Sequence, residues 1–377
     1  MHKEDHLRRQ MIIALHETPG IGWMTIKRAV DTGLWRQRSL SREKLLAVGF
    51  KPNQANLLTE RMSAREFDFA DYSTHVTDIS DIIVLTRYDE SYPQWLQEIA
   101  QPPWVLYLKG RMELLKRPSL SIVGTREPTA GGRSFTEKLS EQLSFYGVTI
   151  VSGLARGIDS KAHEAALRGK GSTIAVLPTP INSCYPPENR NLFRRIGEDG
   201  LLLTETPPGT KLHPGQFPQR NRIIAGLSQG TIVIEGAAKS GSLITAGQAL
   251  EMNREIFAVP GSPSSPKSEG PNGLIKRGEA KLITCVNDIV EELPWLPEAI
   301  EQCLGDAGSE QSDRINQTSQ LTPEELSIIR LLQDQPLSIN EIHELSRIPF
   351  GHLNALLLNL CIKRKIGLQP GALYIVL

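Results

Sequence analysis

Small and cationic residues follow several apolar runs in the middle of this chain, in patterns that suit the binding of anions. Glycine after a strand exposes backbone N–H groups, and arginine can form two parallel hydrogen bonds with one phosphate. Two such segments begin at Gly124 and Ser152, and Asp159 or Ser160 could cap a helix after the second. The candidate residues are Gly124, Arg126, Ser152, Gly153, Arg156, Gly157 and Lys161. Backbone donors and cations at a helix N-terminus together predict an anion site.

Two later segments add to this pattern. One places two arginines around an asparagine ahead of an apolar helix, and the other is a glycine- and serine-rich turn after a strand. Their candidate residues are Arg220, Asn221, Arg222, Lys239, Ser240, Gly241 and Ser242. Residues 153–222 contain ten Lys or Arg against six Asp or Glu, so cations concentrate around the predicted site. An extended polyanion could therefore run across the strand ends.

Enzyme chemistry finds less support in the sequence. The turn at Gly124 is not a G-x-G-x-x-G fingerprint, and the absence of a P-loop motif disfavours a Walker-type nucleotide hydrolase. The four cysteines are widely spaced, so we expect neither a zinc site nor disulfides, and no cofactor. His163, taken singly, is expected to pack or to form hydrogen bonds. Glu205 and Glu235 at strand ends leave open a nucleotide-processing enzyme of the phosphoribohydrolase type that uses the same anion pocket.

The elements that must position these residues begin at about residue 80, where short β-branched runs alternate with helical stretches. Most of these runs are continuously apolar, as strands buried on both faces are. The expected strands are Ile82–Leu85, Val105–Leu108, Ser121–Val123, Thr149–Ser152, Thr173–Leu177, Leu201–Thr204, Thr231–Ile234 and Ile256–Val259. Their alternation with helices predicts a parallel, doubly wound α/β sheet over residues 73–295, with ligands bound at the carboxyl ends of its strands.

Two smaller parts flank this predicted sheet. Residues 1–72 have apolar positions at helical spacing around a Pro-Gly-Ile-Gly turn. This turn resembles a helix-hairpin-helix or SAM-like element, which could bind DNA phosphates or only pack. Residues 296–320 are polar and predict a linker. Residues 321–377 predict a winged helix, but five Lys or Arg against five Asp or Glu make a protein contact at least as well supported as DNA binding.

The overall composition is that of a soluble globular protein. The 377 residues are 40% hydrophobic and 22% charged, and this length predicts two or three domains. No apolar stretch suits a signal peptide or a membrane span, so we expect a cytoplasmic protein. The 42 basic and 42 acidic residues cancel in number, but this total says nothing about their distribution. Only 6% of residues are aromatic, so if the polyanion is a nucleic acid, its phosphate backbone should contribute more to binding than stacking of its bases on aromatic side chains.

Several long motifs in register resemble the DprA/Smf family of DNA-processing proteins. They are SGLARGID, TIAVLPTPINSCYPPEN, FPQRNRIIAGLS, KSGSLITA, AVPGS and EGPNGLIKRGEAKLIT, and the resemblance covers roughly residues 80–293. It implies a Rossmann-like domain that binds and protects single-stranded DNA, acts as a homodimer and loads RecA recombinase during natural transformation. We therefore expect a binding protein and not an enzyme. The chain departs from the family at Ala130-Gly131, where an aromatic–glycine pair that could stack on a base is common.

The resemblance also implies roles for individual residues. Arg126, Arg156 and Lys161 would contact phosphates, and the glycines and Ser152 around the second turn would shape the anion pocket. Arg220 and Arg222 would line the DNA groove. Lys239, Ser240 and Ser242 would close it.

Overall fold

The computed structural model describes residues 3–36, 41–63, 81–298, 300, 322–362, 365–369 and 373–376. The chain divides into two compact units, Met1–Leu293 and Pro294–Leu377. The expected boundary between residues 72 and 73 lies outside the described residues, as does most of the expected linker at 296–320.

Nine strands form one sheet in the first unit, in the order β1-β2-β6-β5-β4-β3-β7-β8-β9. The strands are β1 (Ile83–Thr86), β2 (Val105–Gly110), β3 (Ser119–Val123), β4 (Thr149–Ser152), β5 (Thr173–Val176), β6 (Leu201–Thr204), β7 (Gly230–Val233), β8 (Glu255–Ala258) and β9 (Lys281–Leu282). The chain runs outward from β3 to β6, then returns to the middle and runs outward again from β7 to β9. This doubly wound order confirms the expected Rossmann-like fold and reverses between β3 and β7.

The eight expected strands are present, each within two residues of its expected bounds. All neighbouring pairs from β6 to β9 are parallel. The expectation of parallel pairing is wrong for β1 and β2, because β2 is antiparallel to both β1 and β6. The connection from β1 to β2 holds only the short helix α5 (Gln94–Gln97), not the longer crossover that a parallel pair requires.

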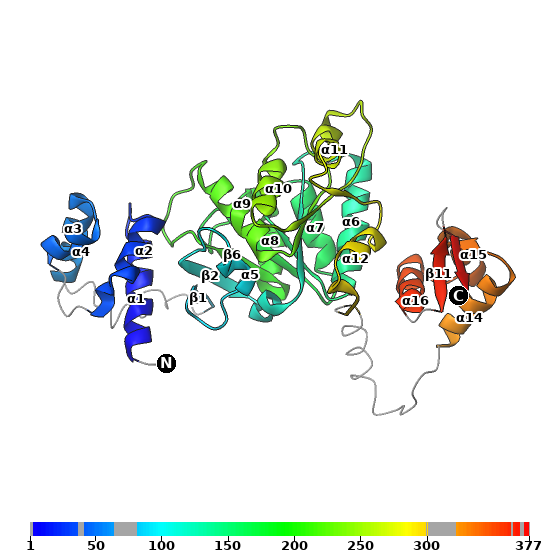
Figure 1. Cartoon of the computed structure of the whole chain (residues 1–377), viewed down its shortest axis with the longest axis horizontal. Helices are drawn as coiled ribbons and strands as arrows, with labels where there is room; N and C mark the ends of the chain where they lie inside the picture. The colour runs from blue at the N-terminus through cyan, green and yellow to red at the C-terminus, as the bar shows by residue number, and fades with distance from the viewer. Residues whose placement is uncertain are drawn as a thin grey trace. The chain divides into compact units, whose positions relative to one another are not determined.

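Helices cover both faces of this sheet (Figure 1). On one face, α9 (Gln216–Leu227) and α10 (Gly241–Glu251) share a core with strand residues such as Val176 and Val233. On the other face, α8 (Arg190–Asp199) packs with Leu202 and with the N-terminal helices. The remaining helices of this unit are α1 (Lys3–Glu17), α2 (Trp23–Asp31), α3 (Arg42–Val48), α4 (Pro52–Ser63), α6 (Ala130–Phe145), α7 (Ile158–Ala166), α11 (Glu269–Lys276) and α12 (Asn287–Glu292).

The N-terminal helices are attached directly to the antiparallel edge of the sheet. Apolar side chains of α1 and α2 belong to the same core as β2, β5 and β6. At the end of α1, the Glu17 carboxylate accepts a hydrogen bond of 2.7 Å from the Tyr107 hydroxyl. The Trp23 indole donates to the Pro102 carbonyl at 2.7 Å. Polar contacts therefore fix the register of these helices on the sheet as well as apolar packing.

From residue 322 onward, the described part of the second unit contains three helices and a small sheet. The helices are α14 (Pro323–Asp334), α15 (Ile339–Ser346) and α16 (Phe350–Ile362). The sheet has the order β10-β12-β11, with β10 (Leu337–Ser338), β11 (Ile366–Gln369) and β12 (Leu373–Val376). A capping box between Thr322 and Glu325 starts α14, as the sequence indicates. These helices and strands lie in the part of the chain for which the sequence predicts a winged helix, and that assignment stays a prediction.

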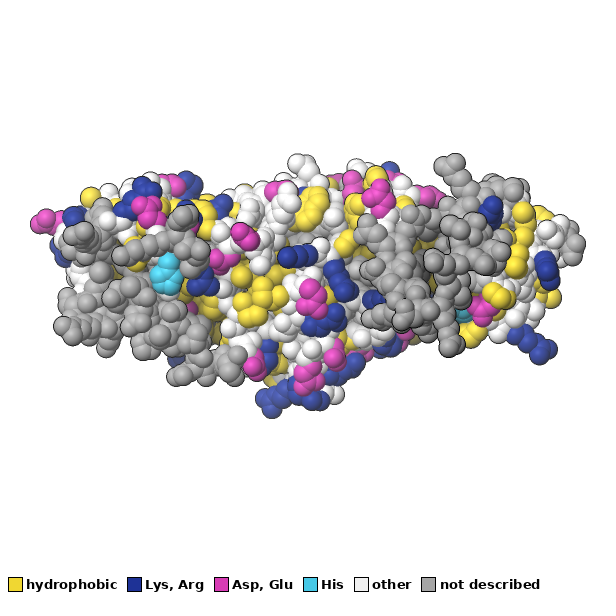
Figure 2. Space-filling view, turned by 90° about the horizontal axis from the view of Figure 1, so that it is seen from below, with side chains coloured by type: hydrophobic (Ala, Val, Ile, Leu, Met, Phe, Trp, Pro, Cys, Tyr) yellow, Lys and Arg dark blue, Asp and Glu magenta, His cyan; other side chains and the backbone are white. Residues whose placement is uncertain are grey.

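Charged side chains are intermixed on the surface that Figure 2 shows. Lys and Arg lie beside Asp and Glu over the central part of this face, where the surface is not grey. This mixture agrees with equal numbers of acidic and basic residues in the chain. Within the described residues, no helix is both long and apolar enough to cross a membrane.

Candidate anion-binding site

Two adjoining pockets open at the carboxyl ends of the central strands. The wider one, of about 510 Å³, is lined by the turn after β3 and by the first turns of α9 and α10. The smaller one is lined by the turn after β4 and by Tyr185. Arg126, Phe217 and Arg220 line both pockets. They lie where the strand order reverses, which is where a doubly wound sheet binds its ligands. We refer to the two together as the anion pockets.

Arg220 is a buried cation between these pockets, and its side chain is held by backbone carbonyls. Its Nη1 donates to the carbonyl oxygens of Gly153 and Val176, the latter at 2.8 Å. Burial lowers the pKa of this guanidinium to about 10, so it stays charged at neutral pH. Asp159 supplies the opposite charge, and burial raises the pKa of its carboxyl while Arg220 opposes that rise. A cation fixed in this way can direct its remaining N–H groups at a phosphate.

The turn after β4 requires glycine at two positions. A Cβ at Gly153 would collide with the Arg220 guanidinium, and a Cβ at Gly157 would collide with the Thr125 carbonyl. Gly157 also has a φ of +80°, which favours glycine. The expectation that Asp159 or Ser160 caps the next helix is wrong, because Gly157 is the N-cap of α7. The Asp159 carboxylate instead accepts a hydrogen bond of 3.1 Å from the Gly153 N–H.

Four cations surround the mouth of the anion pockets with different degrees of neutralisation. Arg156 forms an ion pair of 2.5 Å with Glu188, and Lys161 lies 3.1 Å from the Glu164 carboxylate. Within the described residues, Arg126 and Lys267 have no carboxylate partner. Both line the wider pocket and also a third pocket of about 480 Å³ that includes Lys161. Arg126 and Lys267 are therefore the least neutralised of these four cations.

Other expected site residues meet at the same edge. Gly124 and Asn221 line the wider pocket together with the turn before α10. That turn contributes the residues Ser240, Gly241 and Ser242, and the two serine hydroxyls lie 2.7 Å apart. Residues separated by more than 100 positions in the sequence are thus brought to one pocket by the order of the strands.

Gly157 and Lys161 line only the third pocket, and three further expected residues lie apart from all three pockets. The Ser152 hydroxyl is buried and donates to the Ile122 carbonyl at 2.6 Å, so it ties β4 to β3. Lys239 is exposed and does not line either anion pocket. Arg222 forms an ion pair with Glu205 and donates to the Gln101 carbonyl at 2.7 Å, on the side of α9 that faces the N-terminal helices.

Lys267, Tyr185 and Phe217 line the anion pockets without having been candidates from the sequence. The two aromatic rings pack edge to face, with centroids 5.5 Å apart. Both lie inside motifs quoted above, but a search for cations and glycines passes over them. Lys267 reaches the site because its carbonyl accepts a hydrogen bond of 2.6 Å from the Gly236 N–H after β7. No local pattern in the sequence indicates that contact.

The two strand-end glutamates are not brought together around one ligand. Glu235 accepts hydrogen bonds from the Thr129 N–H at 2.9 Å and the Thr129 hydroxyl at 2.5 Å, at the start of α6. Glu205 is paired with Arg222. The two glutamates line different pockets, and neither of these is an anion pocket. Hydrolysis of a glycosidic bond by two carboxylates needs both to flank the same bond.

The fold and this edge define a Rossmann-like protein with a candidate anion-binding site at its topological switch point. Residues 83–294 match the family described as DNA recombination-mediator protein A. Protein Smf of Synechocystis sp. is 36% identical over 392 residues, which cover 96% of this chain and 97% of that protein. The DNA processing protein DprA of Bacillus subtilis is 50% identical over 206 residues, or 54% of this chain and 69% of that protein. The chain therefore belongs to the DprA/Smf family.

Solved structures agree with this family assignment. DprA from Streptococcus pneumoniae matches with a TM-score of 0.65 and 36% identity, over 74% of this chain and 96% of that one. DprA from Helicobacter pylori, whose structure concerns its mode of binding single-stranded DNA, matches with a TM-score of 0.52 and 31% identity. That match covers 56% of this chain and 94% of the other.

Proposed function

We propose that this protein binds single-stranded DNA along the carboxyl edge of its sheet, without selecting a base sequence. The observation that carries this proposal is the pair of adjoining anion pockets, where buried Arg220 lies beside the un-neutralised Arg126 and Lys267. Such a row of cations suits a phosphate backbone, and Tyr185 and Phe217 offer faces on which bases could stack. The Helicobacter pylori relative, studied for its binding of single-stranded DNA, supports the same ligand.

We further propose that the protein acts in the cytoplasm as a homodimer that protects incoming strands and delivers them to RecA during natural transformation. The family membership supports this role. We also propose that the second unit is a winged helix that contacts a protein. Its helix α16 contains neither Lys nor Arg, whereas a helix that enters a DNA groove usually carries cations.

The binding site can be tested by a shift assay that compares single- and double-stranded DNA. We expect Arg126→Ala/Lys267→Ala to weaken binding of single strands more than Arg156→Ala/Lys161→Ala, because the second pair is already partly neutralised by carboxylates. Each phosphate contact that is lost should reduce the slope of log affinity against log salt by about 0.7. Lys116→Ala, which removes one positive charge ahead of the amino end of β3 and away from the site, is the control and should bind normally. Intact binding by both double variants would refute the site.

We propose that the protein binds DNA and does not turn over nucleotides. Glu235 accepts a hydrogen bond from the Thr129 N–H at the start of α6, and Glu205 forms an ion pair with Arg222. Incubation with nucleoside monophosphates should release no free base. Release of base that is abolished by Glu235→Gln would instead establish the phosphoribohydrolase alternative.

A further inference from the structure

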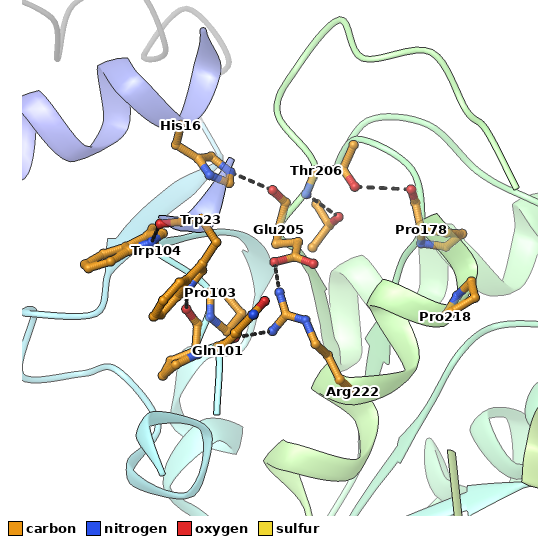
Figure 3. A network of polar contacts seen from close by, with 12 residues as sticks. His16, Trp23, Gln101, Pro103, Trp104, Pro178, Glu205, Thr206, Pro218 and Arg222 are labelled. Carbon is orange, nitrogen blue, oxygen red and sulfur yellow. Dashed lines mark hydrogen bonds and ion pairs between the residues drawn. The ribbon is translucent and has the colours of Figure 1, made fainter. Parts of the chain in front are cut away.

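A separate pocket of about 290 Å³ lies where the N-terminal helices meet the sheet, and nothing in the proposed DNA site uses it. His16 and Trp23 enter it from the N-terminal helices, and Glu205 enters it from the end of β6 (Figure 3). Gln219 and Arg222 enter it from α9. We call this the junction pocket.

The walls of the junction pocket hold one another in place. A ring nitrogen of His16 lies 2.7 Å from the Glu205 carbonyl oxygen, and the Trp23 indole N–H is taken up by the Pro102 carbonyl. The Arg222 guanidinium bridges Glu205 and the Gln101 carbonyl, as Figure 3 shows. Burial lowers the pKa of His16 to about 4, so its imidazole is neutral at physiological pH. The pocket is therefore a formed feature that needs both the N-terminal helices and the sheet.

The junction pocket combines a flat aromatic surface with free amide groups. Trp23 is half-buried and packs against Trp104, with ring centroids 5.4 Å apart, so its indole has little freedom to turn. Within the described residues, the side-chain amides of Gln101 and Gln219 have no hydrogen-bond partner. A fixed aromatic face with amide donors and acceptors near it suits a nucleobase, which needs a stacking surface and partners for its edge.

The junction pocket adjoins the anion pockets through the first turn of α9. Phe217 and Pro218 line the wider anion pocket, whereas Gln216 and Gln219 line the junction pocket. A helix with its side chains is about 10–12 Å across, which a few nucleotides of extended single strand can span. The Thr206 hydroxyl, in the junction pocket, also donates at 3.2 Å to the carbonyl of Pro178, which lines the smaller anion pocket.

We infer that the junction pocket receives a base of the same single strand whose phosphates occupy the anion pockets, with Trp23 as the stacking surface. This inference rests on the proposed function. It gives the N-terminal helices a direct part in DNA binding, supplied by the aromatic junction and not by their Pro-Gly-Ile-Gly turn as a phosphate binder. Because every base has an aromatic face, this contact tolerates any sequence.

The test measures affinities of wild type, Trp23→Leu and Trp23→Phe for oligothymidylates from about 4 to about 16 nucleotides long. We expect Trp23→Leu to weaken binding of the long strands roughly five- to hundredfold, the size of one lost stacking contact, and to leave the shortest unchanged. Trp23→Phe should retain most of the affinity that Trp23→Leu loses, because phenylalanine also offers an aromatic face. The salt slope should not change, because no phosphate contact is removed. A long strand without bases should be insensitive to the substitution.

Gln219→Glu provides a second test if Trp23→Leu fails to fold, since Gln219 is exposed and its replacement disturbs no packing. The added carboxylate should repel a strand that enters the junction pocket and weaken only the long oligonucleotides. The matched control is Gln94→Glu, which is exposed on α5 and should bind as wild type does.

The outcomes separate this inference from the proposed function. If wild type binds no single strand of any length, both fail together. If Arg126 and Lys267 govern binding but Trp23→Leu binds like wild type at every length, the inference alone is overturned. It is also overturned if the substitution weakens strands with and without bases equally. A last outcome would also refute the inference: free thymidine monophosphate quenches the fluorescence of Trp23, but Trp23→Leu does not change the affinity for oligonucleotides. The junction pocket would then be a site for mononucleotides.

Discussion

Gly153 and Arg220 occupy one small space, and this contact determines whether the anion pockets can exist. A methyl group on Gly153 would displace the guanidinium from the Gly153 and Val176 carbonyls. We expect Gly153→Ala to lower the free energy of unfolding by about 1–3 kcal/mol, as overpacking does, and to weaken DNA binding. The control is Gly247→Ala in α10, where a Cβ meets nothing within 4 Å and should stabilise by about 0.5–1 kcal/mol. Urea unfolding measures both, and equal stability of Gly153→Ala and wild type would contradict the contact.

His163 lies buried behind the same turn and makes folding depend on pH. It accepts a hydrogen bond of 3.2 Å from the Leu154 N–H, and burial, with Arg220 adding to it, lowers the pKa of His163 from 6.5 to about 3. Since the unfolded chain takes up this proton first, the stability from neutral His163 is complete above pH 6.5 and is lost as pH falls towards 3.

This residue should therefore reduce the free energy of unfolding by about 1.4 kcal/mol for each pH unit within that window. Urea unfolding of wild type and His163→Gln at neutral and mildly acidic pH checks this. The variant should lose less stability on acidification than wild type. A parallel decline of the two curves would show that His163 is not the titrating group.

At the scale of elements, α9 presents two arginines to opposite sides. Arg222→Leu would leave the half-buried Glu205 carboxylate without its cation, although burial already raises the pKa of that carboxyl. We expect this variant to lose about 1–3 kcal/mol of stability at neutral pH, less than a fully buried pair would, because the carboxylate keeps partial access to water. The loss should shrink as the medium becomes acidic, because a carboxyl with a raised folded pKa is stabilised by protonation. The double variant Arg222→Leu/Glu205→Gln should recover most of the stability that Arg222→Leu loses. Thermal unfolding at two pH values measures this, and a double variant as unstable as Arg222→Leu would contradict the prediction.

Eight of the nine strands of the first unit are predictable from the sequence because each is a short, mostly apolar run, whereas the two-residue strand β9 is not. The direction of β2 is not predictable in this way, since it depends on what the chain does between residues 87 and 104. The helical periodicity of α9 predicts that its two arginines point in different directions. Positions two apart on a helix differ by about 200°, so Arg220 and Arg222 cannot both face one groove.

The candidate site is predictable where its residues follow a strand directly, and also where cations, glycines and serines gather at the start of a helix, as at α9 and α10. Gly124 and Arg126 after β3, and Gly153 and Gly157 after β4, are of the first kind. Lys267 reaches the site through a loop that returns from β8 to the turn after β7, which no local spacing encodes. The same holds for the junction pocket, which forms because α1 and α2 pack against β2 and β6.

At the scale of the whole molecule, zero net charge hides an uneven distribution. Arg126, Arg156, Arg220 and Lys267 lie at the carboxyl edge of one sheet, and within the described residues only Arg156 and Arg220 have acidic partners there, Glu188 and Asp159. If four phosphates are neutralised, the slope of log affinity against log salt for single strands should be about −3. Titration with a labelled oligonucleotide at several salt concentrations measures this slope. A flat affinity across this range would mean that backbone charge does not hold the strand.

The division into two compact units predicts that the first unit alone binds single strands. All residues of the anion pockets and of the junction pocket belong to the first unit. A chain that ends after Ile300, which keeps the buried Leu296 and Ile300, should therefore bind single strands with unchanged affinity and salt slope. The second unit alone should not bind, because α16 lacks cations. If affinity falls on truncation while the salt slope also falls, the second unit contributes phosphate contacts of its own, and its proposed role as a protein-binding winged helix is wrong.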